Sequence, residues 1–299
     1  MTQPAILSIG EVLWDLFPEG ARFGGAPANF ACHAAVLGAK VTMVSAVGSD
    51  LRGREAAEIL RAYNIDTSLI QSITDAPTGT VGVSLDAEGK PTFDIHEGSA
   101  WDGIAWTPDL EARIVESDAI YFGTLTQRCE VSRATIRRAL DLAKESGVLR
   151  ILDVNLRQPF FDTVLIRESV ERANVLKLSN DELEQVAGAC KIESVNNPEA
   201  TLRSLLERYQ LKQVVMTRGA DGAFIVSPDE TIDQAGIPAH VRDTVGAGDA
   251  FTAAFVIGLL RGESLKTIAH DACEIAAAVC AQPGAVPELP GSSQTASGI

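Results

Sequence analysis

Two kinds of segment alternate along the chain. Short continuous apolar runs, typical of strands buried on both faces, are separated by stretches whose apolar residues recur at helical spacing. The runs predicted as strands cover residues 5–9, 40–47, 119–122, 149–154, 175–178, 214–217 and 224–226. The predicted helices cover residues 28–37, 54–63, 132–146, 201–209 and 250–260. This alternation predicts an α/β domain in which helices cover both faces of a mostly parallel sheet.

Two segments depart from this pattern. Residues 80–85 and 92–95 alternate between apolar and polar positions, and the turn residues 86–89 between them predict a hairpin. Residues 12–23 also alternate in part and contain a Pro-Glu-Gly turn. The two segments could form a small sheet outside the main layers. Taken alone, the pattern favours an ordinary edge hairpin over a lid above a binding site.

Composition narrows the class of protein. The 299 residues are 46% hydrophobic, which suits one large domain spanning residues 1–299. Forty acidic and 25 basic residues give a net charge of -15, without basic clusters, so we expect no nucleic-acid partner. An anionic substrate would then need a local correction from helix N-termini, metal ions or a few cations.

Cysteine content and hydropathy bear on location. Five cysteines without C-x-x-C spacing suggest a reducing compartment. The N-terminus shows no signal-peptide pattern, and the longest apolar run, residues 250–260, is too short to cross a bilayer. We therefore expect a cytoplasmic protein without a membrane partner. Residues 287–299 are rich in Pro, Ser and Gly, which predicts a flexible tail.

The strongest chemical signal is Asp-Thr-Val-Gly-Ala-Gly-Asp at residues 243–249, directly before a predicted helix. Gly246 and Gly248 allow a sharp turn that presents backbone N–H groups at a helix N-terminus, which favours an anion. Asp249, in the first turn, could accept the proton of a hydroxyl that attacks phosphorus. Alternatively, Asp249 only caps the helix. That alternative is weakened because the acid, both glycines and the helix occur in one register.

A second glycine pair leads into the helix predicted from residue 28. The sequence at residues 24–29 is Gly-Gly-Ala-Pro-Ala-Asn. The amide of Asn29 offers both a donor and an acceptor to a ligand rich in hydroxyls. By itself, however, the motif is better explained as a plain strand–helix turn with Pro27 at the first helical position.

Together, and in this order, the two motifs resemble the signatures of the ribokinase-like (pfkB) carbohydrate kinases. Residues 47–50 with Gly53 resemble another shared stretch, and Gly10, Glu11 and Asp15 look most like fructokinases. The resemblance covers residues 5–286. It implies a ribokinase-like three-layer α/β/α fold with a small β-sheet lid, formed by about residues 12–24 and 78–101, through which the chain could form a homodimer.

The implied activity is ATP-dependent phosphorylation of a small sugar. Fructose is the first expectation, and ribose, 2-keto-3-deoxygluconate, a nucleoside or another polyol are alternatives. An inactive sugar-binding or regulatory relative is the rival from another class, against which the intact Asp249 and its glycines argue. A dehydrogenase is disfavoured because no G-x-G-x-x-G follows the first strand.

The resemblance also implies individual roles. Catalysis would rest on Asp249 as general base and on the amides of Gly246, Ala247 and Gly248 as an anion hole. The sugar would be bound by Asp15, Gly25, Asn29, Asn155 and Arg157. The nucleotide would be bound by Thr217, Gly219, Gly222 and Cys273. Glu182 would act on Mg²⁺ through water, and Asp243 and Thr244 would hold a monovalent cation such as K⁺. Two positions depart from the family pattern: Ser179 replaces the usual Asn of N-x-x-E, and Cys273 stands where many members have Asn.

Overall fold

The computed structural model describes residues 3–85, 91–193 and 197–287, and strands and helices alternate along them. The strands are β1 (Ala5–Ile9), β2 (Leu13–Phe17), β3 (Gly20–Gly24), β4 (Lys40–Gly48), β5 (Asp66–Ile73), β6 (Gly79–Leu85), β7 (Pro91–Ile95), β8 (Ala119–Gly123), β9 (Leu149–Asp153), β10 (Val175–Ser179), β11 (Gln213–Thr217), β12 (Ala223–Val226) and β13 (Thr231–Gln234). The helices are α1 (Ala26–Val36), α2 (Leu51–Ala62), α3 (Pro108–Val115), α4 (Glu130–Glu145), α5 (Thr163–Arg172), α6 (Leu183–Ala189), α7 (Pro198–Tyr209), α8 (Ala247–Arg261) and α9 (Leu265–Cys280). Short 3₁₀ turns are η1 (Ala100–Gly103), η2 (Leu125–Arg128), η3 (Asn180–Glu182) and η4 (Gly219–Asp221).

The main sheet has the strand order β13-β12-β11-β10-β9-β8-β1-β4-β5. From β11 to β5 every pairing is parallel, as predicted. The predicted strand at residues 224–226 is the exception, because β12 pairs antiparallel with β11 and β13 pairs antiparallel with β12. The connection from β11 to β12 holds little more than η4, and a link that short joins antiparallel strands only.

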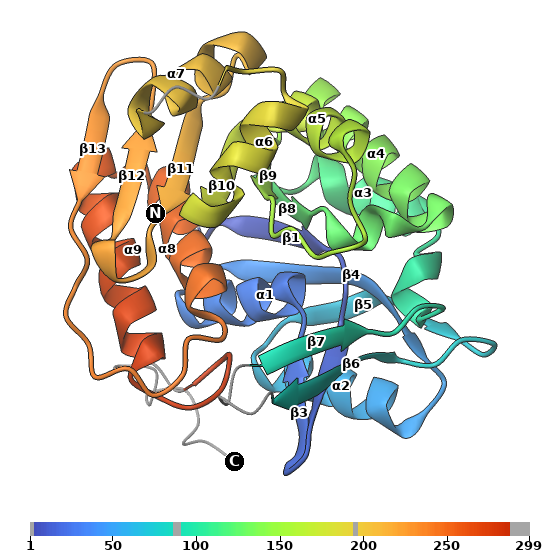
Figure 1. Ribbon diagram of the computed structural model, residues 1–299. Coiled ribbons are helices and arrows are strands. Elements are labelled where there is room, and N and C mark those ends of the chain that lie inside the picture. Colours follow the sequence, from blue (N-terminus) through green and yellow to red (C-terminus); the bar gives the residue numbers. More distant parts are fainter. Residues whose placement is uncertain (1–2, 86–90, 194–196, 288–299) are drawn as a thin grey trace.

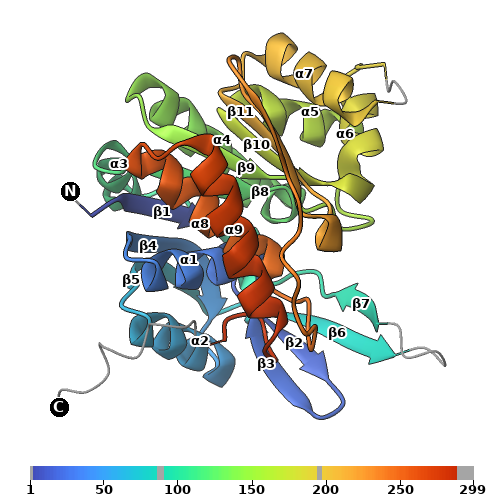
Figure 2. The same cartoon turned by 90° about the vertical axis from the view of Figure 1, so that its left-hand side faces the viewer.

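Helices cover both faces of this sheet (Figures 1 and 2). One apolar core joins the sheet to α3, α4, α5, α6 and α7, and the other joins it to α1, α2, α8 and α9. The expected three-layer α/β/α architecture is therefore confirmed. Among the described residues, no helix combines the length and apolar character needed to span a membrane.

The two segments with alternating patterns supply one separate four-stranded sheet, in the order β3-β2-β6-β7. We call it the small sheet. It projects from one end of the main layers in both views (Figures 1 and 2). The turn predicted at residues 86–89 lies outside the described residues, as does the predicted tail beyond residue 287.

Side-chain capping explains why α2 begins earlier than predicted. Asp50 accepts a hydrogen bond from Gly53 N at 2.8 Å, so the helix begins at Leu51 and not at residue 54. The same carboxylate accepts bonds from Thr78 Oγ1 at 2.6 Å and Thr78 N at 2.9 Å. Because Thr78 directly precedes β6, the stretch around residues 47–53 ties the small sheet to α2.

Candidate active site

A cavity of about 440 Å³ lies between the small sheet and the carboxyl ends of the parallel strands. Such edges are the usual ligand sites of open α/β sheets. Predicted site residues on its wall are Asp15, Gly25, Asn29, Asn155, Arg157, Thr244, Gly246, Gly248 and Asp249. Residues that the sequence analysis did not assign to a site also line it: Glu11, Leu13, Phe17, Ala26, Val81, Phe93, Ile95, Leu125, Lys177 and Val245.

The turn before α8 depends on one glycine. Gly246 is the N-cap residue with φ 80°, and a Cβ there would lie 2.0 Å from the Ala285 carbonyl oxygen. Gly248 lies inside the helix, and an added Cβ would have Lys177 Nζ, at 3.4 Å, as its nearest neighbour. The prediction that both glycines make the turn is thus wrong for Gly248, which instead leaves room beside Lys177.

Backbone N–H groups gather at this end of α8, because the first four amides of a helix have no partner in its ladder. The bond from Ala250 N to the Gly246 carbonyl, at 2.9 Å, begins that ladder. Ala247 N donates to the Thr244 carbonyl at 3.4 Å, which is long for a hydrogen bond. Asp249 lies in this first turn, as predicted.

Asn29 connects the two glycine motifs, although 220 residues separate it from Asp249. Its Nδ2 donates to Asp249 Oδ2 at 2.9 Å. Asn29 Oδ1 is buried without a hydrogen-bond partner among the described residues, so an acceptor remains for a ligand. Gly25, with φ 107°, precedes this helix, and a Cβ there would lie 2.6 Å from the Glu11 carbonyl oxygen. This close approach leaves no room for a side chain, which explains why residue 25 is a glycine.

The pKa of Asp249 is raised to about 7, first by burial and then by the nearby Asp153 carboxylate. The hydrogen bond from Asn29 opposes this rise, because it stabilises the charged form. A carboxylate with a pKa near neutrality is suited to act as a general base.

Lys177 is the functional candidate that the sequence analysis missed. Its Nζ lies 3.0 Å from Oδ1 of the buried Asp153, its register partner on the neighbouring strand β9. Thr252 Oγ1 donates to the Gly248 carbonyl at 2.8 Å and lies 3.3 Å from Asp153 Oδ2. A lysine within an otherwise apolar buried run was the signal that could have revealed a paired charge.

Two further carboxylates line the cavity, Glu11 and Asp15. Burial raises the pKa of Glu11, whose Oε2 accepts a hydrogen bond from Thr126 Oγ1, and raises the pKa of Asp15 to about 6. Arg157 opposes both shifts. Asn155 has a left-handed φ of 43°, a conformation that asparagine tolerates better than most residues.

The carboxylates of both predicted metal sites already accept hydrogen bonds from the protein. Glu182 accepts from Leu156 N at 2.6 Å, from Ser179 N at 2.7 Å and from Ser179 Oγ at 2.9 Å. Asp243 accepts from Val245 N at 3.1 Å and from Gly284 N at 3.0 Å. Neither residue is part of the described cavity wall, whereas Thr244 is.

None of the predicted nucleotide-binding residues is among those that line the cavity. Thr217 ends β11, and Gly219 lies in η4. Gly222 has φ 90°, and a Cβ there would lie 2.1 Å from the Gln234 carbonyl oxygen, so chain packing alone requires a glycine. Cys273 is 6% exposed within the apolar core, which raises the pKa of its thiol to about 11.

Comparison with known proteins identifies relatives over nearly the whole chain. The family model described as "pfkB family carbohydrate kinase" matches residues 19–291. An ATP-dependent 6-phosphofructokinase of Thermoanaerobacterium thermosaccharolyticum is 27% identical, over 95% of this chain and 90% of the relative. Fructokinase-2 of Solanum lycopersicum is 28% identical, over 97% and 94%. The fructokinase structure from Vibrio cholerae O395 with fructose, ADP and calcium is 25% identical with a TM-score of 0.79, over 95% and 94%.

Proposed function

The chain belongs to the pfkB family of carbohydrate kinases, and from this premise we propose that it transfers the γ-phosphoryl group of ATP to a hydroxyl of free fructose. The position of Asp249 carries the proposal. Its carboxylate lies in the first turn of α8, on the wall of a cavity that also holds Asp15, Asn29 and Asn155. Carboxylate and amide groups offer the donors and acceptors that sugar hydroxyls need.

The reaction needs alignment and charge neutralisation more than covalent chemistry. Asp249 accepts the proton of the attacking sugar hydroxyl while the oxygen of that hydroxyl forms a bond to the γ-phosphorus. ADP leaves with the electrons of the broken P–O bond. The amides of Gly246, Ala247 and Gly248 lie at the positive end of the α8 dipole, where negative charge would develop. Lys177, beside Gly248, adds a positive charge to this end of the cavity.

Magnesium, when bound, supplies neutralisation of the phosphate charge. The contacts of Glu182 fit an indirect role for this residue. A carboxylate has about four acceptor sites, and three bonds from Leu156 and Ser179 already use most of them. Glu182 is therefore suited to holding one metal-bound water, and not to direct coordination.

The nucleotide would extend from α8 toward the end of β11, so that Thr217, Gly219 and Gly222 line its phosphates and Cys273 lies behind the adenine. Thr217 pairs in register with Ser179, which holds Glu182, so these groups share one edge of the sheet. The small sheet would act as a lid that excludes water from the transfer, and it could also carry a dimer contact. Asp243 and Thr244 would hold a monovalent cation.

The charge of the cavity favours an unphosphorylated sugar. The cavity wall holds three carboxylates, those of Glu11, Asp15 and Asp249, and two cationic side chains, those of Arg157 and Lys177. Lys177 is already paired with Asp153. A sugar phosphate brings about two more negative charges. The second candidate is phosphorylation of fructose 6-phosphate, favoured by the 6-phosphofructokinase relative and by Arg157 as an anion ligand.

A coupled assay of ATP consumption tests the proposal with fructose, fructose 6-phosphate, ribose, 2-keto-3-deoxygluconate and a nucleoside. We expect the highest kcat/KM for fructose, by at least about tenfold over the phosphorylated sugar, the factor that 1.4 kcal/mol represents. A higher value for any other acceptor would reject fructose. If no acceptor stimulates ATP consumption, the inactive sugar-binding alternative is favoured.

A further inference from the structure

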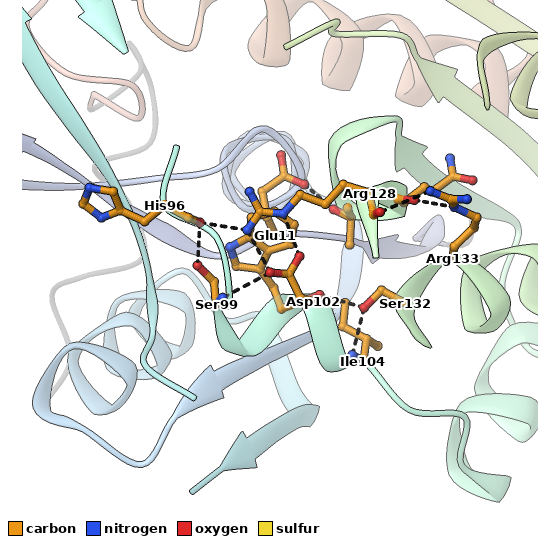
Figure 3. Close-up of polar contacts among 11 residues, drawn as sticks. Glu11, His96, Ser99, Asp102, Ile104, Arg128, Ser132 and Arg133 are labelled. Carbon is orange, nitrogen blue, oxygen red and sulfur yellow. Dashed lines mark hydrogen bonds and ion pairs between the residues drawn. The ribbon is translucent and has the colours of Figure 1, made fainter. Parts of the chain in front are cut away.

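The small sheet is joined to the main layers at both ends of its β6–β7 hairpin. Before β6, Thr78 is held by Asp50, as described above. After β7 the chain runs through His96 and Ser99 into η1, where Asp102 lies. This second junction depends on Arg128, the last residue of η2 (Figure 3).

Arg128 makes three hydrogen bonds across this junction (Figure 3). Its Nε donates to Asp102 Oδ1 at 2.7 Å, and its Nη2 donates to Asp102 Oδ2 at 2.8 Å and to the His96 carbonyl at 2.8 Å. The Arg128 side chain is only 4% exposed. Paired bonds from a planar guanidinium to a carboxylate define an orientation as well as an attraction.

The same guanidinium also lies against two aromatic rings of a small apolar cluster. Its Cζ lies 3.9 Å from the centroid of the Trp101 ring and 4.7 Å from that of Phe160. Trp101 belongs to a small apolar cluster in which Phe160 packs at the edge. The other members of that cluster all line the cavity: Leu13, Val81, Ile95 and Leu125.

Both parts that Arg128 connects are themselves fixed to α4. Arg133 Nε donates to the Gln127 carbonyl at 2.6 Å, which holds η2. Ser132 Oγ donates to the Trp101 carbonyl at 2.7 Å and accepts from Ile104 N at 2.9 Å, which holds η1 (Figure 3). Arg128 therefore ties the end of β7 to segments that are themselves held by α4, and Ser99 Oγ donates to the same His96 carbonyl at 3.1 Å.

We propose that Arg128 is a positioning residue for sugar binding: it fixes the end of β7 against η2, and so sets how Ile95 and Leu125 pack together in the cavity wall. The proposal rests on the proposed function only in naming a sugar as the ligand. A buried ion pair adds little net stability compared with apolar residues of the same shape, although removing one partner alone leaves a buried charge and lowers stability. The geometry of the pair, in contrast, decides where the attached segment lies.

Two conservative variants test this. Arg128→Lys keeps the charge but loses the paired geometry, and Asp102→Asn keeps the shape but loses the charge. In both we expect the KM for the sugar to rise on the order of tenfold, with the KM for ATP unchanged and kcat at saturating sugar largely retained. Arg138→Lys is the matched control, because Arg138 lies 4.0 Å above the Trp106 ring and pairs with Glu111 on the surface.

Amide hydrogen exchange gives a readout that needs no substrate. We expect faster exchange over residues 91–103 in Arg128→Lys and Asp102→Asn, without loss of protection in β8 and β9, and no change in Arg138→Lys. An unchanged sugar KM, an equal rise in the KM for ATP, or faster exchange throughout the main sheet would overturn the proposal. If the unaltered protein phosphorylates no sugar, the proposed function fails. The amide hydrogen exchange of residues 91–103 still decides whether Arg128 fixes that segment.

Discussion

The hydrogen bond from Asn29 to Asp249 allows the proposed base to be tested through its pKa. The bond stabilises the charged carboxylate, so its removal in Asn29→Ala should raise the pKa of Asp249 above its value of about 7. Hydrogen bonds to charged groups contribute about 1.5–3 kcal/mol, and one pKa unit corresponds to about 1.4 kcal/mol. The expected shift is therefore about one to two units upward.

The measurement is kcat/KM for the sugar as a function of pH, because this ratio reports the pKa of the free enzyme. A base must be deprotonated, so the activity of the unaltered enzyme should fall as pH drops through about 7. In Asn29→Ala the same fall should begin about one to two units higher. A fall that stays in place, or moves to lower pH, would refute the assignment of Asp249 as the base held by Asn29.

Two further variants serve as controls for this experiment. Asn155→Ala removes another amide from the cavity wall. Among the described residues, no hydrogen bond joins Asn155 to Asp249. Asn155→Ala should therefore lower kcat/KM without moving the pH at which activity falls. Asp249→Asn should lower kcat by roughly 10²–10⁴-fold and abolish this pH dependence in the residual activity.

Three other outcomes are expected. Gly246→Ala should lower the free energy of unfolding by about 1–3 kcal/mol, because Gly246 has a left-handed φ and lies close to the Ala285 carbonyl. Gly248→Ala should instead lower turnover with little change in stability. Equal losses of stability in thermal unfolding would contradict this difference. Activity should be higher in K⁺ than in Na⁺ at equal ionic strength, and Asp243→Ala should remove the difference; equal rates in the unaltered enzyme would reject the cation site. Glu182→Gln should raise the Mg²⁺ concentration needed for half-maximal activity without changing the sugar KM, and an unchanged Mg²⁺ titration would reject the indirect role.

The layered fold was largely predictable because it follows from local patterns. Strands buried on both faces must be continuously apolar, so the parallel strands other than β5 were found near their observed bounds. Four of the helices in the described residues, α3, α5, α6 and α9, were not predicted, and the edge strands were also missed. β5 and β13 lie at the two edges of the main sheet, where partial exposure removes that signal, and neither was predicted. The antiparallel pairing of β12 depends on the short link after β11.

The placement of Gly246 and Asp249 at the N-terminus of α8 was also predictable, because both lie within one turn of a single helix. The pairs that complete the site were not. Asn29 meets Asp249, Lys177 meets Asp153, and Arg128 meets Asp102 across 220, 24 and 26 residues. Such contacts depend on strand register and on how helices pack, and no local pattern specifies either. The sequence by itself therefore determined the layers and the proposed base, whereas the tertiary structure decided what holds that base and shapes the cavity around it.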